Sequence, residues 1–225
     1  MHGPTQLLED GFMTVSLDVR VPPHGLLGTL HIPEHVFALV IFAQNGGSGR
    51  PIGRDGLIAE ALNRRGIATL LLDLRTRKEG KTSRRAKASD IPVLAERLAD
   101  AIQWTEKAAS LKGLRVGLFG ADTAAAAALM AAAKLGPRVG AVVSCSGRPD
   151  LAGDALMAVR APTLLIVGGA DRAEIASNKQ TLARLRGPKE LVVVPRATHL
   201  LAEPDAIEQV SAQAGRWFKR HLRAR

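Results

Sequence analysis

The chain has no tyrosine and a single cysteine, and aromatic residues make up only 3% of its 225 positions. One cysteine excludes an internal disulfide framework and fits a reducing compartment, so we expect a cytoplasmic protein. No apolar run approaches the roughly 18 residues that span a bilayer, and the N-terminal segment lacks the pattern of a signal peptide. Clusters of cysteine and histidine with metal-ligand spacing are also missing. We therefore expect no metal, no other cofactor and no membrane partner.

Basic residues are in excess, with a formal net charge of +10. Such a surface affects solubility and attracts anions, but it says little about the fold. Seven of the basic residues lie in the segment 75–87, which is either an anion site at a pocket rim or a solvated loop. No aromatic stacking platform accompanies the charge, so a specific nucleic-acid partner is not predicted.

Apolar runs alternate with amphipathic stretches along the whole chain. An antiparallel hairpin is predicted over 12–31, and buried strands over 37–43, 67–74, 114–119, 139–144, 163–167 and 191–194. Helices are predicted over 53–65, 89–110, 123–134, 150–159, 173–185 and 204–222. This alternation predicts one three-layer α/β domain over residues 1–225, with a mostly parallel sheet of about eight strands.

One junction between a strand and a helix has an unusual composition. The apolar run 116–119 ends in small residues around Asp122, and an alanine-rich helix follows directly. Gly120 and Ala124 flank the aspartate two positions away on each side, as expected where the turn is too tight for larger side chains. This is the shape of a nucleophile elbow, usually G-x-S-x-G and here G-x-D-x-A. The turn should lift the Asp122 side chain above the sheet.

Two further strand ends carry residues suited to hydrolysis, because Asp171 and His199 each follow a predicted strand. The carboxyl ends of parallel strands meet at one edge of a sheet. The order nucleophile, acid, histidine along the chain is that of α/β-hydrolases. We predict Asp122 as the nucleophile or as a carboxylate that positions water. His199 would be the general base, and Asp171 the acid that orients it.

Acyl transfer also needs backbone N–H groups that hold an oxyanion. We expect them from Thr123, the residue after the elbow, and from Asn45 in the loop that Gln44 and Asn45 open after the third predicted strand. The substrate is expected to be a small molecule, with an anionic one left open.

With this elbow, acid and histidine in this order, the sequence resembles the α/β-hydrolase superfamily, and within it the small dienelactone-hydrolase-like proteins that lack a cap domain. Some of those proteins are fused to phosphoribosyltransferases. Besides the elbow, the resemblance is carried by the segments 59–63, 70–74, 147–153, 161–169 and 197–204. It covers nearly the whole chain and implies a hydrolase of a small ester- or lactone-like substrate.

The sequence departs from that family at the expected centre. Relatives carry serine or cysteine at the position of Asp122, glycine at that of Ala124, and His-Gly where this chain has Gln44 and Asn45. Dehalogenases and epoxide hydrolases use an elbow aspartate as nucleophile. Those enzymes also have a cap domain, for which the segment 145–161 is too short, and epoxide hydrolases open the ring with cap tyrosines that this chain lacks.

Two interpretations of Asp122 therefore stay open. In one it takes part in hydrolysis. In the other the chain is a catalytically inactive binding or regulatory protein, in which Asp122 forms an ion pair with His199. A variant of that interpretation is an esterase whose serine was replaced by aspartate through engineering. Cys145 near the predicted site is either a reactive thiol or, as the lack of a neighbouring base favours, an inert one. The oligomeric state is open, a homo-oligomer included.

Overall fold

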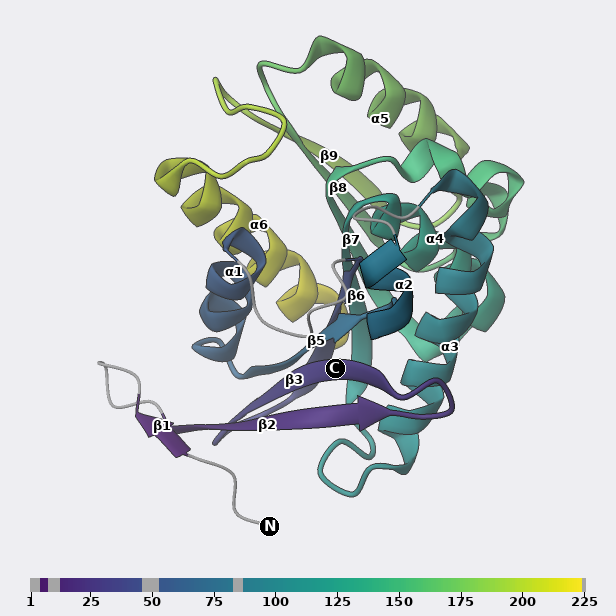
Figure 1. Cartoon of the computed structure of the whole chain (residues 1–225). Helices are drawn as coiled ribbons and strands as arrows, with labels where there is room; N and C mark the ends of the chain where they lie inside the picture. The colour runs from purple at the N-terminus through teal and green to yellow at the C-terminus, as the bar shows by residue number, and fades with distance from the viewer. Residues whose placement is uncertain (1–4, 8–12, 46–52, 83–86, 224–225) are drawn as a thin grey trace.

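The computed structural model describes residues 5–7, 13–45, 53–82 and 87–223. A nine-stranded sheet runs through the molecule in the order β1-β2-β3-β5-β4-β6-β7-β8-β9 (Figure 1). β1 to β3 and the pairing of β3 with β5 are antiparallel, and all other pairs are parallel. The strands are β1 Thr5–Leu7, β2 Met13–Val21, β3 Leu26–Pro33, β4 Ala38–Gln44, β5 Ile67–Asp73, β6 Arg115–Asp122, β7 Val139–Gly147, β8 Thr163–Gly168 and β9 Lys189–Val194.

Helices cover both faces of this sheet. α1 and α6 lie on one face, and α3 and α4 lie on the other (Figure 1). The α-helices are α1 Arg54–Asn63, α2 Arg77–Thr82, α3 Ile91–Lys107, α4 Thr123–Leu135, α5 Arg172–Arg184 and α6 Pro204–Leu222. The 3-10 helices among the described residues are η1 Ala88–Asp90, η2 Gly136–Arg138 and η3 Pro149–Ala158.

Side-chain size explains how closely the helices approach the sheet. Every residue of β5 is buried, as expected for a central strand covered on both faces. Five consecutive alanines at the start of α4 are buried as well, and their small side chains let that helix lie directly against β6 and β7. On the other face, a side chain at Gly117 would come within 2.7 Å of the Phe218 ring, so the glycine makes room for α6.

The predicted α/β architecture is confirmed, with a mostly parallel sheet and an antiparallel N-terminal pair. Three details differ. β1 adds a ninth strand, and its three residues are too few to show an alternating pattern. The segment predicted as a helix over 150–159 is the 3-10 helix η3, interrupted at Gly153, where φ is 56°. The polar loop predicted over 75–87 contains α2, in which Glu79 pairs with Arg97 of α3.

The connection between β7 and β8 holds η3 and no inserted domain, as the prediction of a cap-less fold requires. The glycine-rich segment that follows Asn45 lies outside the described residues. None of the helices in the described part of the chain is long and apolar enough to cross a membrane.

Candidate functional site

The elbow is a strained turn between β6 and α4. Asp122 ends the strand with φ of 48° and ψ of −132°, a conformation that residues other than glycine rarely adopt. A Cβ at position 120 would lie 2.7 Å from the carbonyl oxygen of Ala124, so Gly120 is required for the turn to close. The tight turn predicted from the small residues is confirmed.

Positive φ values at residues other than glycine occur at three more of the described residues: Ser146, Arg196 and Leu201. Ser146 lies near the end of β7, and the other two lie in the segment after β9. Strained backbone therefore occurs at or beyond the carboxyl ends of β6, β7 and β9, the edge of the sheet where α/β proteins place functional residues.

The Asp122 side chain is exposed and makes no hydrogen bond that caps α4. Its backbone oxygen accepts a hydrogen bond from the N–H of Arg148, 3.0 Å away. The guanidinium of Arg148 is paired with Asp150, which raises its pKa, and the charge of Asp122 adds to that effect. Asp122 thus lies at the amino end of α4 and near the positive charge of Arg148.

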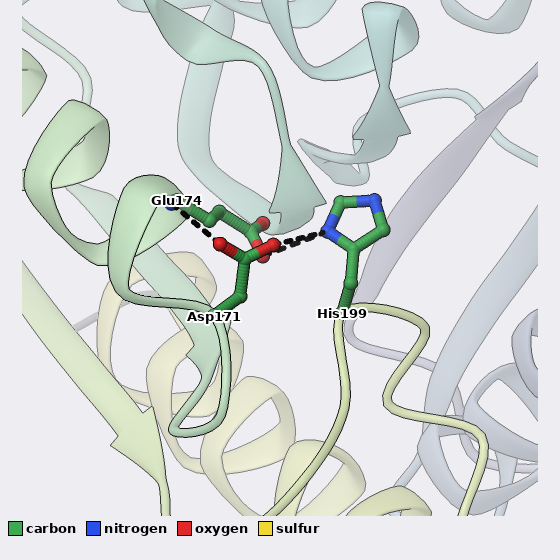
Figure 2. A group of neighbouring side chains, drawn as sticks. All are labelled: Asp171, Glu174 and His199. Carbon is green, nitrogen blue, oxygen red and sulfur yellow. Dashed lines mark hydrogen bonds and ion pairs between the residues drawn. The ribbon is translucent and has the colours of Figure 1, made fainter.

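His199 lies in the segment that follows β9, with its side chain about half exposed. Its Nδ1 atom is 2.9 Å from Oε2 of Glu174 and 3.5 Å from Oδ2 of Asp171. Figure 2 shows both carboxylates on the Nδ1 side of the ring, with the second ring nitrogen turned away from them. Within the described part of the chain, no ion pair joins His199 to Asp122, so the ion pair between them that would mark a locked site is not formed.

The two acids come from the start of α5. Asp171 is the N-cap of this helix, and its Oδ1 accepts the N–H of Glu174 at 2.9 Å. This cap places Glu174 in the first helical turn, where it is only 6% exposed. Burial raises the pKa of the Glu174 carboxyl, and the hydrogen bond with His199 partly opposes that shift.

Glu174 was missed by the sequence reasoning, although a signal existed. An aspartate at an N-cap followed three residues later by glutamate normally indicates a capping box. The pattern places this glutamate in the first turn of the helix, close to its cap. It does not say that the segment after β9 lies against that turn.

Arg54 is a second residue that sequence reasoning missed. It begins α1 directly after the undescribed glycine-rich segment and donates a hydrogen bond to the backbone oxygen of Leu200, next to His199. Burial disfavours its charge, but the neighbouring Cys145, Asp55 and Glu174 outweigh this and raise the pKa of the arginine. Arg54 therefore ties the start of α1 to the histidine-bearing segment.

The residues predicted for the oxyanion hole lie together. The side-chain amide of Asn45 is 2.8 Å from the hydroxyl of Thr123. In the amide orientation that satisfies its neighbours, Asn45 Oδ1 accepts from this hydroxyl and from the N–H of Ala124 at 3.2 Å, while Nδ2 donates to Gln44. Asn45 therefore bridges the end of β4 to the elbow.

Two further groups bear on the chemistry available here. Cys145, beside Ala121 of the elbow strand, is fully buried, and burial raises its pKa to about 12, so the thiol is inert. Asp171, Glu174 and His199 offer ligand atoms that all lie within 4.8 Å of one another, a spacing that would also suit a divalent cation.

The chain is similar to a solved hydrolase structure over nearly its whole length. Dienelactone hydrolase from Anabaena variabilis is 44% identical, with a TM-score of 0.87, and the alignment covers 94% of this chain and 99% of that one. The chain belongs to the dienelactone hydrolase family. Est1E from Butyrivibrio proteoclasticus is 13% identical with a TM-score of 0.72, over 92% of this chain and 98% of that one, which shows the fold alone. No family model matches the sequence.

Two curated proteins from strains of Mycobacterium tuberculosis are 47% identical over 206 residues, which is 92% of this chain. Both carry the name "Putative phosphoribosyl transferase". The match covers 46% of each, so the chain spans about half the length of these relatives. The resemblance to dienelactone-hydrolase-like proteins is confirmed, and at a coarse level the structural neighbours support a hydrolase.

Proposed function

We propose that this chain hydrolyses a small ester- or lactone-like molecule, with Asp122 at the centre of the reaction. The observation that carries the proposal is an exposed carboxylate on a strained elbow, in a chain of the dienelactone hydrolase family. β6, β7, β8 and β9 are adjacent and parallel, so Asp122, Asp171 and His199 follow strand ends at the same edge of the sheet.

The chemistry follows from what each group can do. His199 is the general base, and its ring nitrogen that faces away from the two carboxylates would take a proton from water. In one mode, the carboxylate of Asp122 attacks the saturated carbon bound to the ester oxygen, the bond between that carbon and the oxygen breaks, and the oxygen leaves as part of a carboxylate. Water activated by His199 then attacks Cγ of Asp122, hydrolyses the new ester and releases the alcohol. In the other mode, Asp122 accepts a hydrogen bond from the water and directs it at the substrate.

The backbone N–H groups of Thr123 and Asn45 would hold the oxygen that becomes negative, and Gln44 at the end of β4 lies next to Asn45 in the chain. The contact between Asn45 and Thr123 supports this, because it fixes the loop after β4 against the amino end of α4. Donors fixed in advance stabilise developing charge by several kcal/mol, roughly 3 for one donor.

The alternative is a catalytically inactive binding or regulatory protein that keeps the fold without the reaction. We expect the purified chain to hydrolyse short acyl esters, small lactones or haloacids, and expect Asp122→Asn and His199→Ala to lose that activity. Asp122→Ser, which restores the usual nucleophile of the family, separates the two interpretations. A parent that turns over nothing while Asp122→Ser becomes active would contradict the proposed role of Asp122 and favour the alternative.

Turnover in H₂¹⁸O distinguishes the two modes. If Asp122 attacks the substrate, ¹⁸O enters its own carboxylate, and mass spectrometry finds the peptide that contains it heavier. If Asp122 only directs water, ¹⁸O enters the product and this peptide keeps its mass. The same peptide from His199→Ala, incubated in parallel, is the control for spontaneous exchange.

A further inference from the structure

Two carboxylates face one ring nitrogen of His199, although one is enough to fix an imidazole. The distance to Glu174, 2.9 Å, is that of a hydrogen bond. The distance to Asp171, 3.5 Å, lies beyond the usual range for N–H···O. The distances alone indicate that the Nδ1–H of His199 donates its hydrogen bond to Glu174 and not to Asp171.

Asp171 has a different partner at hand. Its other carboxylate oxygen accepts the N–H of Glu174 and so caps α5, a role that explains an aspartate at this position without reference to His199. The Asp171 side chain is 31% exposed and that of Glu174 is 4% exposed. A hydrogen bond is stronger where water is excluded, so burial also favours the bond to Glu174.

We propose that Glu174, and not Asp171, is the residue that fixes the orientation and tautomer of His199. The inference rests on the proposed function, in which His199 is the general base. Glu174 is a positioning residue, because it acts through the imidazole. In α/β-hydrolases the acid that orients the histidine follows directly after a strand. In this chain that acid would be Glu174, in the first turn of α5, and its backbone is held there by the cap that Asp171 provides.

Burial gives this arrangement a second effect. Oε1 of Glu174 is buried and has no hydrogen-bond partner among the described residues. A buried carboxylate with an unsatisfied oxygen is costly while His199 is neutral, and the cost falls when the ring takes a proton and becomes a cation. Glu174 therefore favours the protonated ring that forms during the reaction. The other ionisable groups that influence it are Asp171, which opposes its charge, and Arg54, which supports it.

The test is a proton NMR spectrum of the imidazole. An Nδ1–H held by a buried carboxylate gives a resonance at low field, and His199→Gln identifies it by its loss. We expect Glu174→Gln to lose this resonance or move it upfield, and Asp171→Asn to keep it, since asparagine also caps helices well. Glu208→Gln, an exposed change of the same kind on α6, is the control and should keep it too.

Kinetics provide the second readout. We expect Glu174→Gln to lower kcat about 10²-fold or more with little change in KM, the scale of general-base catalysis. Asp171→Asn should lower kcat much less. Glu174→Asp, which keeps the charge but shortens the reach, should recover part of the loss. Circular dichroism checks that each variant is folded.

Loss of the low-field resonance in Asp171→Asn but not in Glu174→Gln would overturn the proposal and return the role to Asp171. The spectrum does not depend on turnover. If no substrate is hydrolysed and the resonance still depends on Glu174, the proposed function fails while the assignment of the hydrogen bond stands.

Discussion

The strained backbone at Asp122 leads to a prediction that separates the cost of the turn from the chemistry of the side chain. With φ of 48° and ψ of −132°, the residue lies where a Cβ is unfavourable. Such strain costs of order 1–3 kcal/mol, whereas glycine elsewhere is less stable than alanine by about 0.5–1 kcal/mol. The net expectation is that Asp122→Gly is more stable than Asp122→Ala by about 1 kcal/mol.

Both variants lose the carboxylate, so the comparison isolates the backbone. With an m-value of about 2.5 kcal/mol/M, urea denaturation should place the midpoint of Asp122→Gly about 0.4 M above that of Asp122→Ala. Ser146→Gly, measured against Ser146→Ala, should show the same sign, because Ser146 has the same φ of 48°. If Asp122→Gly unfolds at the lower urea concentration, as at an ordinary position, the elbow is not strained and the reasoning fails.

Two further predictions concern ionisable groups. The hydrogen bond from Arg97 holds the pKa of Glu79 at about 2 instead of 4.5, so the stability this pair provides is present above pH 4.5 and is lost as the pH falls toward 2. Because the Glu79 side chain is 42% exposed, solvent screening reduces the effect, and Glu79→Gln should lower the free energy of unfolding by about 1 kcal/mol at neutral pH. An equal loss measured by urea denaturation at pH 2 would contradict this prediction. The pKa of Cys145 is raised to about 12 by burial, so Ellman's reagent at pH 8 should react with it only after urea unfolds the chain; rapid labelling of the folded protein would show an accessible thiol.

The parts of the fold that depend on local sequence could be predicted. A continuous apolar run such as β5 and the small residues around the elbow each constrain the backbone within a few positions. β1 could not be predicted, because its three residues are too few to show an alternating pattern. A helix over 150–159 could be predicted, but its 3-10 form and the break at Gly153 could not, since the composition does not reveal them.

The candidate site divides in the same way. Its residues at strand ends follow from topology, which brings the ends of parallel strands to one edge. The contact of Glu174 with His199 spans 25 positions and depends on how the segment after β9 folds back over α5. No local pattern encodes such a contact. Arg54 could not be predicted for the same reason, because its partner Leu200 is 146 positions away.

Three of the residues with unfavourable φ, Asp122, Ser146 and Arg196, have a consequence for the evolution of such a chain. Selection for heat resistance alone would favour glycine at these three places, since each replacement relieves a penalty without removing a large buried side chain. Leu201 differs, because its side chain is fully buried and glycine there would leave a cavity in the core. Relatives under that selection, with no requirement for catalytic turnover, would first replace these three residues at the carboxyl ends of the strands and keep the rest of the fold. A relative that retained non-glycine residues at all three would therefore show selection for something other than stability.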